Sequence, residues 1–204
     1  MNQILGKRIN KKKYLIILFF SIFALIIIIL YLIYFYYNLS MKQNFSKKLM
    51  NNFNLENLYL NSNQNYEIIN LNENCNYFII GIIEISKINI KYPILSTIND
   101  ELLKISPCRF YGCYPNEFGN LCIAGHNYDN STFFSDLYKL DIGDIINIYD
   151  SKNTCISYYI YSKYETSMQD TSCTKQDINK KEITLVTCNN LNKKRLIIKA
   201  CEKK

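Results

Sequence analysis

The sequence has very little of several residue types on which common active sites depend. Its 204 residues include one histidine, His126, so a zinc site built on two histidines is excluded. The six glycines form neither G-x-G-x-x-G nor G-x-x-x-x-G-K, so no phosphate-binding loop is indicated. No G-x-S-x-G occurs, which argues against a serine hydrolase. The residues left for chemistry are cysteines, one histidine and ordinary charged side chains.

An excess of charge is also absent from most of the chain. The formal net charge is +7, but five cations lie among the first 13 residues, where there is no acid. The remaining 19 basic and 17 acidic residues nearly balance. Such a body lacks the basic face that binding to phosphates requires, so we expect no nucleic-acid partner.

A long apolar run follows the basic N-terminus. Residues 15–35 carry no charge, and 21 residues at ~1.5 Å each span roughly 31 Å, the thickness of a bilayer core. The preceding cations place the N-terminus in the cytoplasm. The alternative is a cleaved signal peptide, but the run is longer than a typical signal core and no A-x-A site follows. We expect a single-pass cell-membrane protein whose remaining chain is extracellular.

The composition divides the chain into four parts. We expect a cytoplasmic basic tail over 1–13, a transmembrane signal-anchor helix over 14–37 and a polar tether over 38–76. The tether is rich in Asn, Lys and Ser, and a short amphipathic helix within 41–60 is an open alternative. Residues 77–204 are long enough to bury one core, and we expect them to form the functional domain.

From Tyr77 onward the sequence favours a mainly β fold. Short runs dense in Ile, Val, Tyr and Thr are separated by turn residues, which is typical of a sandwich or barrel. We expect two short helices between them, over Asn99–Lys104 and Thr132–Leu140. The runs that predict strands are FIIGIIEI, INIKYPIL, NLCIAGH, DIINIYD, CISYYIYSKYE, EITLVTC and RLIIKA.

Three reactive side chains fall at the ends of these expected strands. His126 follows NLCIAG, where Gly125 permits a sharp exit, and Cys188 ends EITLVTC. Arg195 opens the last strand. A thiol attacks a carbonyl only as thiolate, which a nearby imidazole or cation favours, and a guanidinium can hold a developing oxyanion. Cys188, His126 and Arg195 are therefore candidates for nucleophile, acid/base and oxyanion stabiliser, although spacing alone does not bring them together.

The chain resembles the sortases, the cysteine transpeptidases of bacterial surfaces. The run TLVTC (Thr184–Cys188) with Arg195 seven residues later resembles the family signature. GIIEISKINIKYPIL, LCIAGHN and FFSDLYKLDIGDIINIYD resemble other family segments in family order. The resemblance implies an eight-stranded β-barrel with short helices. Because the chain stops at Lys204 without a second span, and no Asp-Pro-aromatic motif occurs, we expect a housekeeping or class D-like enzyme.

The resemblance also implies roles and partners. Cys188 would attack an LPXTG-like sorting signal and form a thioacyl enzyme, His126 would act as general acid and then base, and Arg195 would position substrate and oxyanion. The partners would be surface-protein sorting-signal peptides and a cell-wall amine. Two alternatives stay open: a cysteine peptidase that only hydrolyses, and a catalytically silent wall-binding β-domain.

No cofactor or metal is expected. Calcium binding is not carried over, and Glu165, Asp170 and Asp177 are expected to be solvated loop charges. Cys122 and Cys155 are interpreted as small apolar residues on strands, and a Cys108–Cys113 disulfide is possible. The cysteines besides Cys188 are Cys75, Cys108, Cys113, Cys122, Cys155, Cys173 and Cys201.

Overall fold

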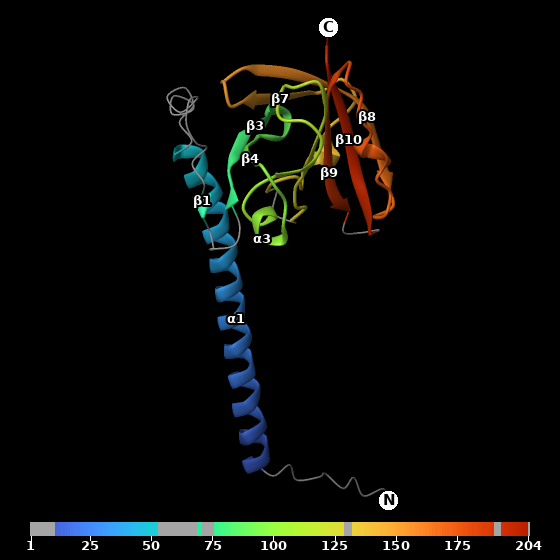
Figure 1. Ribbon diagram of the computed structural model, residues 1–204. Coiled ribbons are helices and arrows are strands. Elements are labelled where there is room, and N and C mark those ends of the chain that lie inside the picture. The colour runs from blue at the N-terminus through green and yellow to red at the C-terminus, as the bar shows by residue number, and fades with distance from the viewer. Residues whose placement is uncertain (1–10, 53–68, 71–75, 129–131, 190–192, 204) are drawn as a thin grey trace, which may run out of the picture. The chain divides into compact units, whose positions relative to one another are not determined.

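A computed structural model describes residues 11–52, 69–70, 76–128, 132–189 and 193–203 of the chain. The chain divides into two compact units, Met1–Gln43 and Asn44–Lys204. Figure 1 shows the long helix of the first unit and the strands of the second.

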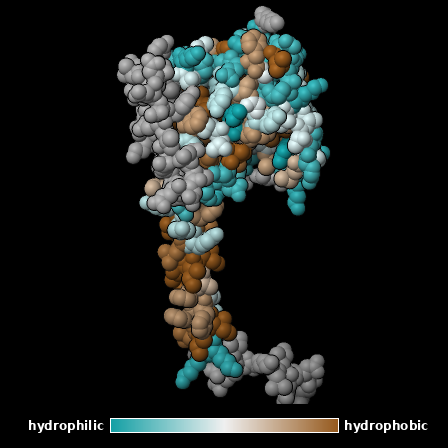
Figure 2. Space-filling model, in the orientation of Figure 1, coloured by the Kyte–Doolittle hydropathy of each residue, from teal (hydrophilic) through white to brown (hydrophobic). Residues whose placement is uncertain are grey.

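Helix α1 (Lys11–Asn52) contains the apolar run. Its stretch Lys12–Asn38 is long and apolar enough to cross a membrane, and its side chains are exposed, as the brown band in Figure 2 shows. The helix continues to Asn52, so the first part of the expected tether is helical. Residues 53–68 and 71–75 of that tether, with Cys75, lie outside the described residues. Between these gaps, β1 (Ile69–Asn70) pairs antiparallel with β2 (Asn76–Tyr77).

Eight strands close into a barrel in the order β10-β8-β7-β3-β4-β5-β6-β9, which confirms the predicted mainly β, eight-stranded fold. Neighbouring strands are antiparallel except in the β4–β5 and β6–β9 pairs. The barrel strands are β3 (Ile79–Ile85), β4 (Ile90–Leu95), β5 (Cys108–Tyr111), β6 (Gly119–Ala124), β7 (Ile145–Asp150), β8 (Cys155–Thr166), β9 (Lys181–Asn189) and β10 (Lys194–Glu202).

The barrel core follows from the alternation of side chains along each strand. In β9, Ile183 and Leu185 point inward, and in β10 Leu196 and Ile198 do the same. Each fully buried Ile, Leu or Phe contributes roughly 1.5–3 kcal/mol through removal from water. The main core cluster also includes Ile80, Ile83, Ile85, Ile90, Ile94, Leu121, Ile123, Phe134, Leu137, Leu140, Ile146, Ile148, Tyr158, Ile160 and Ala200.

Several local predictions can be compared with these elements. Helix α3 (Asp100–Leu103) lies where a helix was expected, and the Asn99 side chain caps it by accepting a hydrogen bond from the backbone N–H of Leu102 at 2.8 Å. The helix predicted over 132–140 is wrong except for the 3₁₀ turn η2 (Leu137–Lys139), because Phe133 has φ +51° and pairs with Asn127 in a β-bridge. The remaining short turns are η1 (Ser86–Ile88) and η3 (Ser172–Thr174).

The described cysteines form no disulfide, so a Cys108–Cys113 bridge is not present. Cys108 is buried, and burial raises the pKa of its thiol to about 12. Cys122 is buried as expected, whereas Cys155 is exposed at the start of β8, contrary to the expectation of an apolar environment. The free cysteines are Cys108, Cys113, Cys122, Cys155, Cys173, Cys188 and Cys201.

Candidate active site

Cys188 lies near the end of β9 and its thiol is on the outer face of the barrel. Ile183 and Leu185 point into the core, so Val186 and Cys188 point outward by alternation along the strand. Val186 packs in a separate outer cluster with Ile197, and Cys188 is exposed. The candidate nucleophile is therefore accessible on the outer face, at the barrel rim.

Arg195 lies directly beside Cys188. Strands β9 and β10 are antiparallel, and their register pairs Arg195 with Cys188 and Ile197 with Val186. Directly paired residues project to the same side of a sheet, so the guanidinium and the thiol share the outer face. Lys194 pairs with Asn189 instead, and it belongs to the alternate set of side chains along β10. The register therefore places Arg195, and not Lys194, on the same face of the sheet as Cys188.

His126 reaches the same rim from β6. That strand runs parallel to β9 with Ala124 beside Val186, and the backbone N–H of Gly125 continues the pairing by donating to the carbonyl of Val186 at 3.1 Å. His126 lies two residues beyond Ala124, just as Cys188 lies two residues beyond Val186 on the parallel neighbouring strand. The register thus brings both residues to adjacent ends of parallel strands.

Two side-chain hydrogen bonds join the His126 segment to β9. The hydroxyl of Thr187 donates to the carbonyl of Gly125 at 2.8 Å, and this bond is buried. The side-chain N–H of Asn127 donates to the carbonyl of Cys188, also at 2.8 Å. The residues on both sides of His126 are therefore fixed to the strand that carries Cys188.

The loop after His126 closes back on itself. The backbone N–H of Phe134 donates to the carbonyl of His126 at 3.0 Å, and the hydroxyl of Ser135 accepts from the backbone N–H of Tyr128 at 2.9 Å. The Tyr128 ring lies against the imidazole, with 4.8 Å between ring centroids. Gly125 has no space for a side chain, because a Cβ there would lie 2.6 Å from the Phe134 ring. Local packing thus limits the position of the imidazole.

The pKa of His126 is lowered from its usual 6.5. Burial is the main cause, because it disfavours the charged imidazolium, and the positive charge of Lys104 adds to the effect. Asp100 at the start of α3 acts in the opposite direction. At neutral pH the imidazole of His126 is therefore mainly uncharged.

The segment between β8 and β9 covers the outer face beside this site. The Asn120 side chain, fully buried on β6, donates to the carbonyls of Cys173 and Lys175 at 3.0 and 3.1 Å. Thr184 on β9 donates to the Asn120 carbonyl oxygen at 2.8 Å. Cys173 packs against Val186 and Ile197, and the charge of Arg195 acts on its thiol. This segment borders the Cys188–Arg195 face of the barrel.

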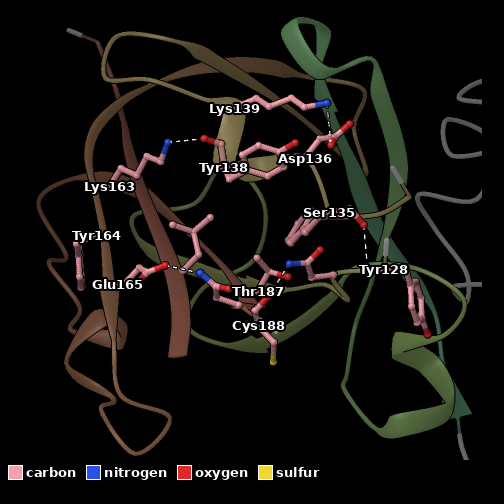
Figure 3. Close-up of a pocket in the computed structure, with 14 residues that line it drawn as sticks. Tyr128, Ser135, Asp136, Tyr138, Lys139, Lys163, Tyr164, Glu165, Thr187 and Cys188 are labelled. Carbon is pink, nitrogen blue, oxygen red and sulfur yellow. Dashed lines mark hydrogen bonds and ion pairs between the residues drawn. The ribbon is translucent and has the colours of Figure 1, made fainter. Parts of the chain in front are cut away.

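A pocket of about 880 Å³ lies at the mouth of the barrel, and we call it the barrel-mouth pocket. Figure 3 shows most of its side chains within the ring of strands, whereas the Cys188 sulfur points away from them. Neither His126 nor Arg195 lines it. Its lining residues are Asn127, Tyr128, Phe134, Ser135, Asp136, Tyr138, Lys139, Lys163, Tyr164, Glu165, Thr187, Cys188, Asn189 and Leu196.

The described residues include no group of three or more histidine, cysteine or acidic side chains that could hold a metal ion. Glu165 was expected to lie in a loop, but it belongs to β8. Its carboxylate accepts a hydrogen bond from the side chain of Asn189. No role for Asn127 or Thr187 is predicted from the sequence. The only signal for them was their position next to His126 and Cys188.

Comparisons with known proteins identify the family. A family model described as the sortase domain matches residues 83–203, more than half of the chain, and the chain therefore belongs to the sortase family. It is 29% identical over 127 residues to sortase A of Bacillus anthracis, and the match covers 58% of this chain and 57% of that relative. The chain thus spans little more than half the length of this curated relative.

Solved structures share the barrel. A sortase D5 transpeptidase of Clostridium perfringens matches with a TM-score of 0.61 and 29% identity, over 81% of this chain and 98% of that one. Sortase A of Corynebacterium diphtheriae matches with a TM-score of 0.57 and 25% identity, over 62% and 61%. Sortase A of Listeria monocytogenes, at 20% identity and a TM-score of 0.57, shows the fold alone.

Proposed function

We propose that this protein is a sortase-type cysteine transpeptidase, with Cys188 as nucleophile, His126 as general acid and base, and Arg195 as the group that positions substrate and oxyanion. The observation that carries the proposal is the strand register, which puts Arg195 opposite Cys188 and brings the His126 segment beside them. Membership of the sortase family supports the same assignment. The substrate would be an LPXTG-like sorting signal, and the acceptor a cell-wall amine.

In the first half-reaction the Cys188 thiolate attacks the carbonyl carbon of the scissile peptide bond. A carbon–sulfur bond forms, and Arg195 stabilises the oxyanion. His126, as imidazolium, gives its proton to the leaving amine as the carbon–nitrogen bond breaks. The product is a thioacyl enzyme. Because the pKa of His126 is lowered, the imidazolium that this step needs is the minority form at neutral pH.

In the second half-reaction neutral His126 takes a proton from the incoming amine. The amine nitrogen bonds to the thioester carbon, the carbon–sulfur bond breaks, and Cys188 leaves as thiolate. Water in place of the amine would give hydrolysis through the same intermediate. Membership of the family also supports a surface location with α1 as the membrane anchor. The five cations before the apolar run favour an N-terminus inside and a barrel outside.

The proposal is tested with the full chain in detergent micelles, incubated with a pool of LPXTG-like peptides with and without an added amine. We expect a thioester adduct on Cys188, detected by intact mass, that resolves faster with amine than with water. Cys188→Ala should form no adduct, while Cys155→Ala, which removes the other exposed described thiol, should leave it unchanged.

Adduct formation on the Cys188→Ala protein would contradict the mechanism. Products with water only would identify a peptidase. A folded protein that binds peptide without any adduct would identify the silent binding domain instead.

A further inference from the structure

We propose that Tyr128 is a positioning residue for His126, and that its ring holds the imidazole in one orientation. The inference rests on the proposed function and names a further residue on which that reaction depends. The Tyr128 ring is itself held by two other aromatic side chains. We call the row formed by the side chains of Tyr92, Phe133 and Tyr128 the aromatic stack.

The first argument is the contact between the two rings. The ring centroids of Tyr128 and His126 lie 4.8 Å apart, and the ring planes are tilted by 38°. This separation falls within the range of about 4.5–7 Å in which aromatic pairs attract each other. Both side chains are half-buried. The Tyr128 ring thus occupies the space on one side of the imidazole and restricts its rotation.

The second argument is that the Tyr128 ring is held in turn. The centroid of the Phe133 ring lies 6.0 Å from that of Tyr128 and 5.2 Å from that of Tyr92. Phe133 is only 2% exposed, and its backbone N–H donates to the Tyr92 hydroxyl at 3.3 Å. Tyr92 belongs to β4 and packs against the main core cluster. The aromatic stack therefore connects the imidazole to a strand of the barrel.

The backbone of Phe133 gives independent support. Its φ of +51° is a left-handed conformation, which is costly for a bulky residue and persists where the surroundings fix it. Phe133 pairs with Asn127 in a β-bridge, and the backbone N–H of Phe134 donates to the carbonyl of His126 at 3.0 Å. The turn at Phe133 thus places its ring in the stack while the same segment binds the backbone around His126.

The ring of Tyr128 matters here, and not its hydroxyl. Burial raises the pKa of the Tyr128 phenol above its usual 10, so the phenol is neutral at neutral pH. On the neighbouring α3 segment the charge of Lys104 lowers this pKa and that of Glu101 raises it. A neutral phenol with a raised pKa is a poor proton donor at this pH. Replacing Tyr128 by phenylalanine should therefore preserve its role.

The ring also affects the charge state of the imidazole. An aromatic face within about 6 Å attracts a cation, so the Tyr128 ring favours the imidazolium that protonates the leaving amine. Burial and the charge of Lys104 lower the pKa of His126, and Asp100 raises it. The ring of Tyr128 thus acts in the same direction as Asp100 and opposes burial, without adding a charged group beside the imidazole.

The test compares two substitutions in the full chain in detergent micelles, with cleavage of an LPXTG-like peptide as the assay. Tyr128→Leu keeps apolar cover over the imidazole but removes the ring. It should lower kcat about 10- to 100-fold and change KM less than about twofold, because a displaced imidazole slows the reaction without weakening peptide binding. Tyr128→Phe keeps the ring and should keep kcat within about twofold of the wild type.

Tyr159→Leu is the matched control, because it removes another half-buried tyrosine. Tyr159 pairs with Cys201, at the end of β10 that is far from Arg195. This variant should change neither kcat nor KM. An equal loss in Tyr128→Leu and Tyr159→Leu would show an effect of stability alone, and an equal loss in Tyr128→Phe would assign the role to the hydroxyl. Either result, or an unchanged kcat in Tyr128→Leu, would overturn the proposal.

The imidazole itself provides a measurement that does not depend on catalysis. His126 is the only histidine, so in full-length Cys188→Ala protein labelled at histidine all imidazole NMR signals belong to it. We expect one sharp set of signals in this protein and with Tyr128→Phe added, and loss of the single sharp set with Tyr128→Leu added. Unchanged signals with Tyr128→Leu would refute the positioning role. A wild type that forms no thioacyl enzyme, with signals that respond as expected, would contradict the proposed function and leave the positioning role standing.

Discussion

At the residue scale, the candidate site depends on the contacts that hold three side chains, and the contact of Asn127 is the most direct. Asn127 directly follows His126 in the chain, and its side-chain N–H donates to the backbone carbonyl of Cys188. A displacement of about 1 Å between reacting groups can cost about 100-fold in rate. We therefore expect Asn127 to be a positioning residue for His126 and Cys188.

We expect Asn127→Ala to lower kcat/KM for a sorting peptide by about 10- to 100-fold, mainly through kcat. Asn147→Ala is the control, since it also removes a side-chain hydrogen bond, from Ser157 at 2.8 Å, but between β7 and β8. Peptide-cleavage kinetics of the two variants are compared at equal folded fractions. An equal loss in both would show that Asn127 contributes only stability.

The second residue-scale prediction concerns the charge state of His126. Its pKa should lie below 6.5, because burial and Lys104 both disfavour the imidazolium. Lys104→Gln should raise this pKa, and Asp100→Asn should lower it further. Since His126 is the only histidine, the pKa can be measured by titrating the imidazole NMR signals, and no signal assignment is needed. A pKa above 6.5, or no response to Lys104→Gln, would contradict the electrostatic account.

The same shift sets a direction for stability. The native protein binds the His126 proton less readily than the unfolded chain does, so the unfolded state gains protons first as pH falls. The contribution of His126 to the free energy of unfolding is therefore complete above about pH 6.5 and is lost as pH falls through the native pKa.

At the element scale, the exit of β6 determines where His126 points. Gly125 is buried, and a Cβ at this position would meet the Phe134 ring at 2.6 Å. The Phe134 ring is fully buried in the main core, so it has little room to move. The close approach of strand and loop thus requires glycine at this position.

We expect Gly125→Ala to lower the free energy of unfolding by about 1–3 kcal/mol, the usual cost of overpacking, and to displace His126. Denaturant unfolding and peptide cleavage measure the two effects. The double variant Gly125→Ala/Phe134→Leu should recover part of both, because the smaller side chain relieves the contact. If the double variant recovers neither, contact with the Phe134 ring is not the reason that glycine is required at position 125.

At the scale of the whole molecule, the proposed location is the cell surface, with α1 as membrane anchor and the barrel outside. Cys188 and Cys155 are exposed on the barrel. We expect a membrane-impermeant thiol reagent to label both residues in intact cells, as read from peptide masses. Cys188→Ala should lose only its own label. Labelling that requires cell lysis would reverse the proposed orientation.

The parts of this protein that the sequence determined are those with local signals. Seven of the eight barrel strands were visible as β-branched and aromatic runs, and the apolar helix as an uncharged run. β5 (Cys108–Tyr111) was missed, because four residues containing an arginine carry little periodicity. The helix expected over 132–140 failed, since Phe133 and Phe134 serve the β-bridge and the barrel core instead.

The candidate site was named from the sequence, but only the tertiary structure decided how its members meet. Cys188, His126 and Arg195 are separated along the chain, and two strand registers place Arg195 beside Cys188 and the end of β6 beside the end of β9. The side chains of Asn127 and Glu165 form hydrogen bonds with residues 61 and 24 positions away along the chain. Residue identity and local periodicity determine the chemistry that is available and most of the strands. The pairing of strands that are distant in sequence determines which of these residues lie close together, because no single stretch of chain encodes how distant segments pack.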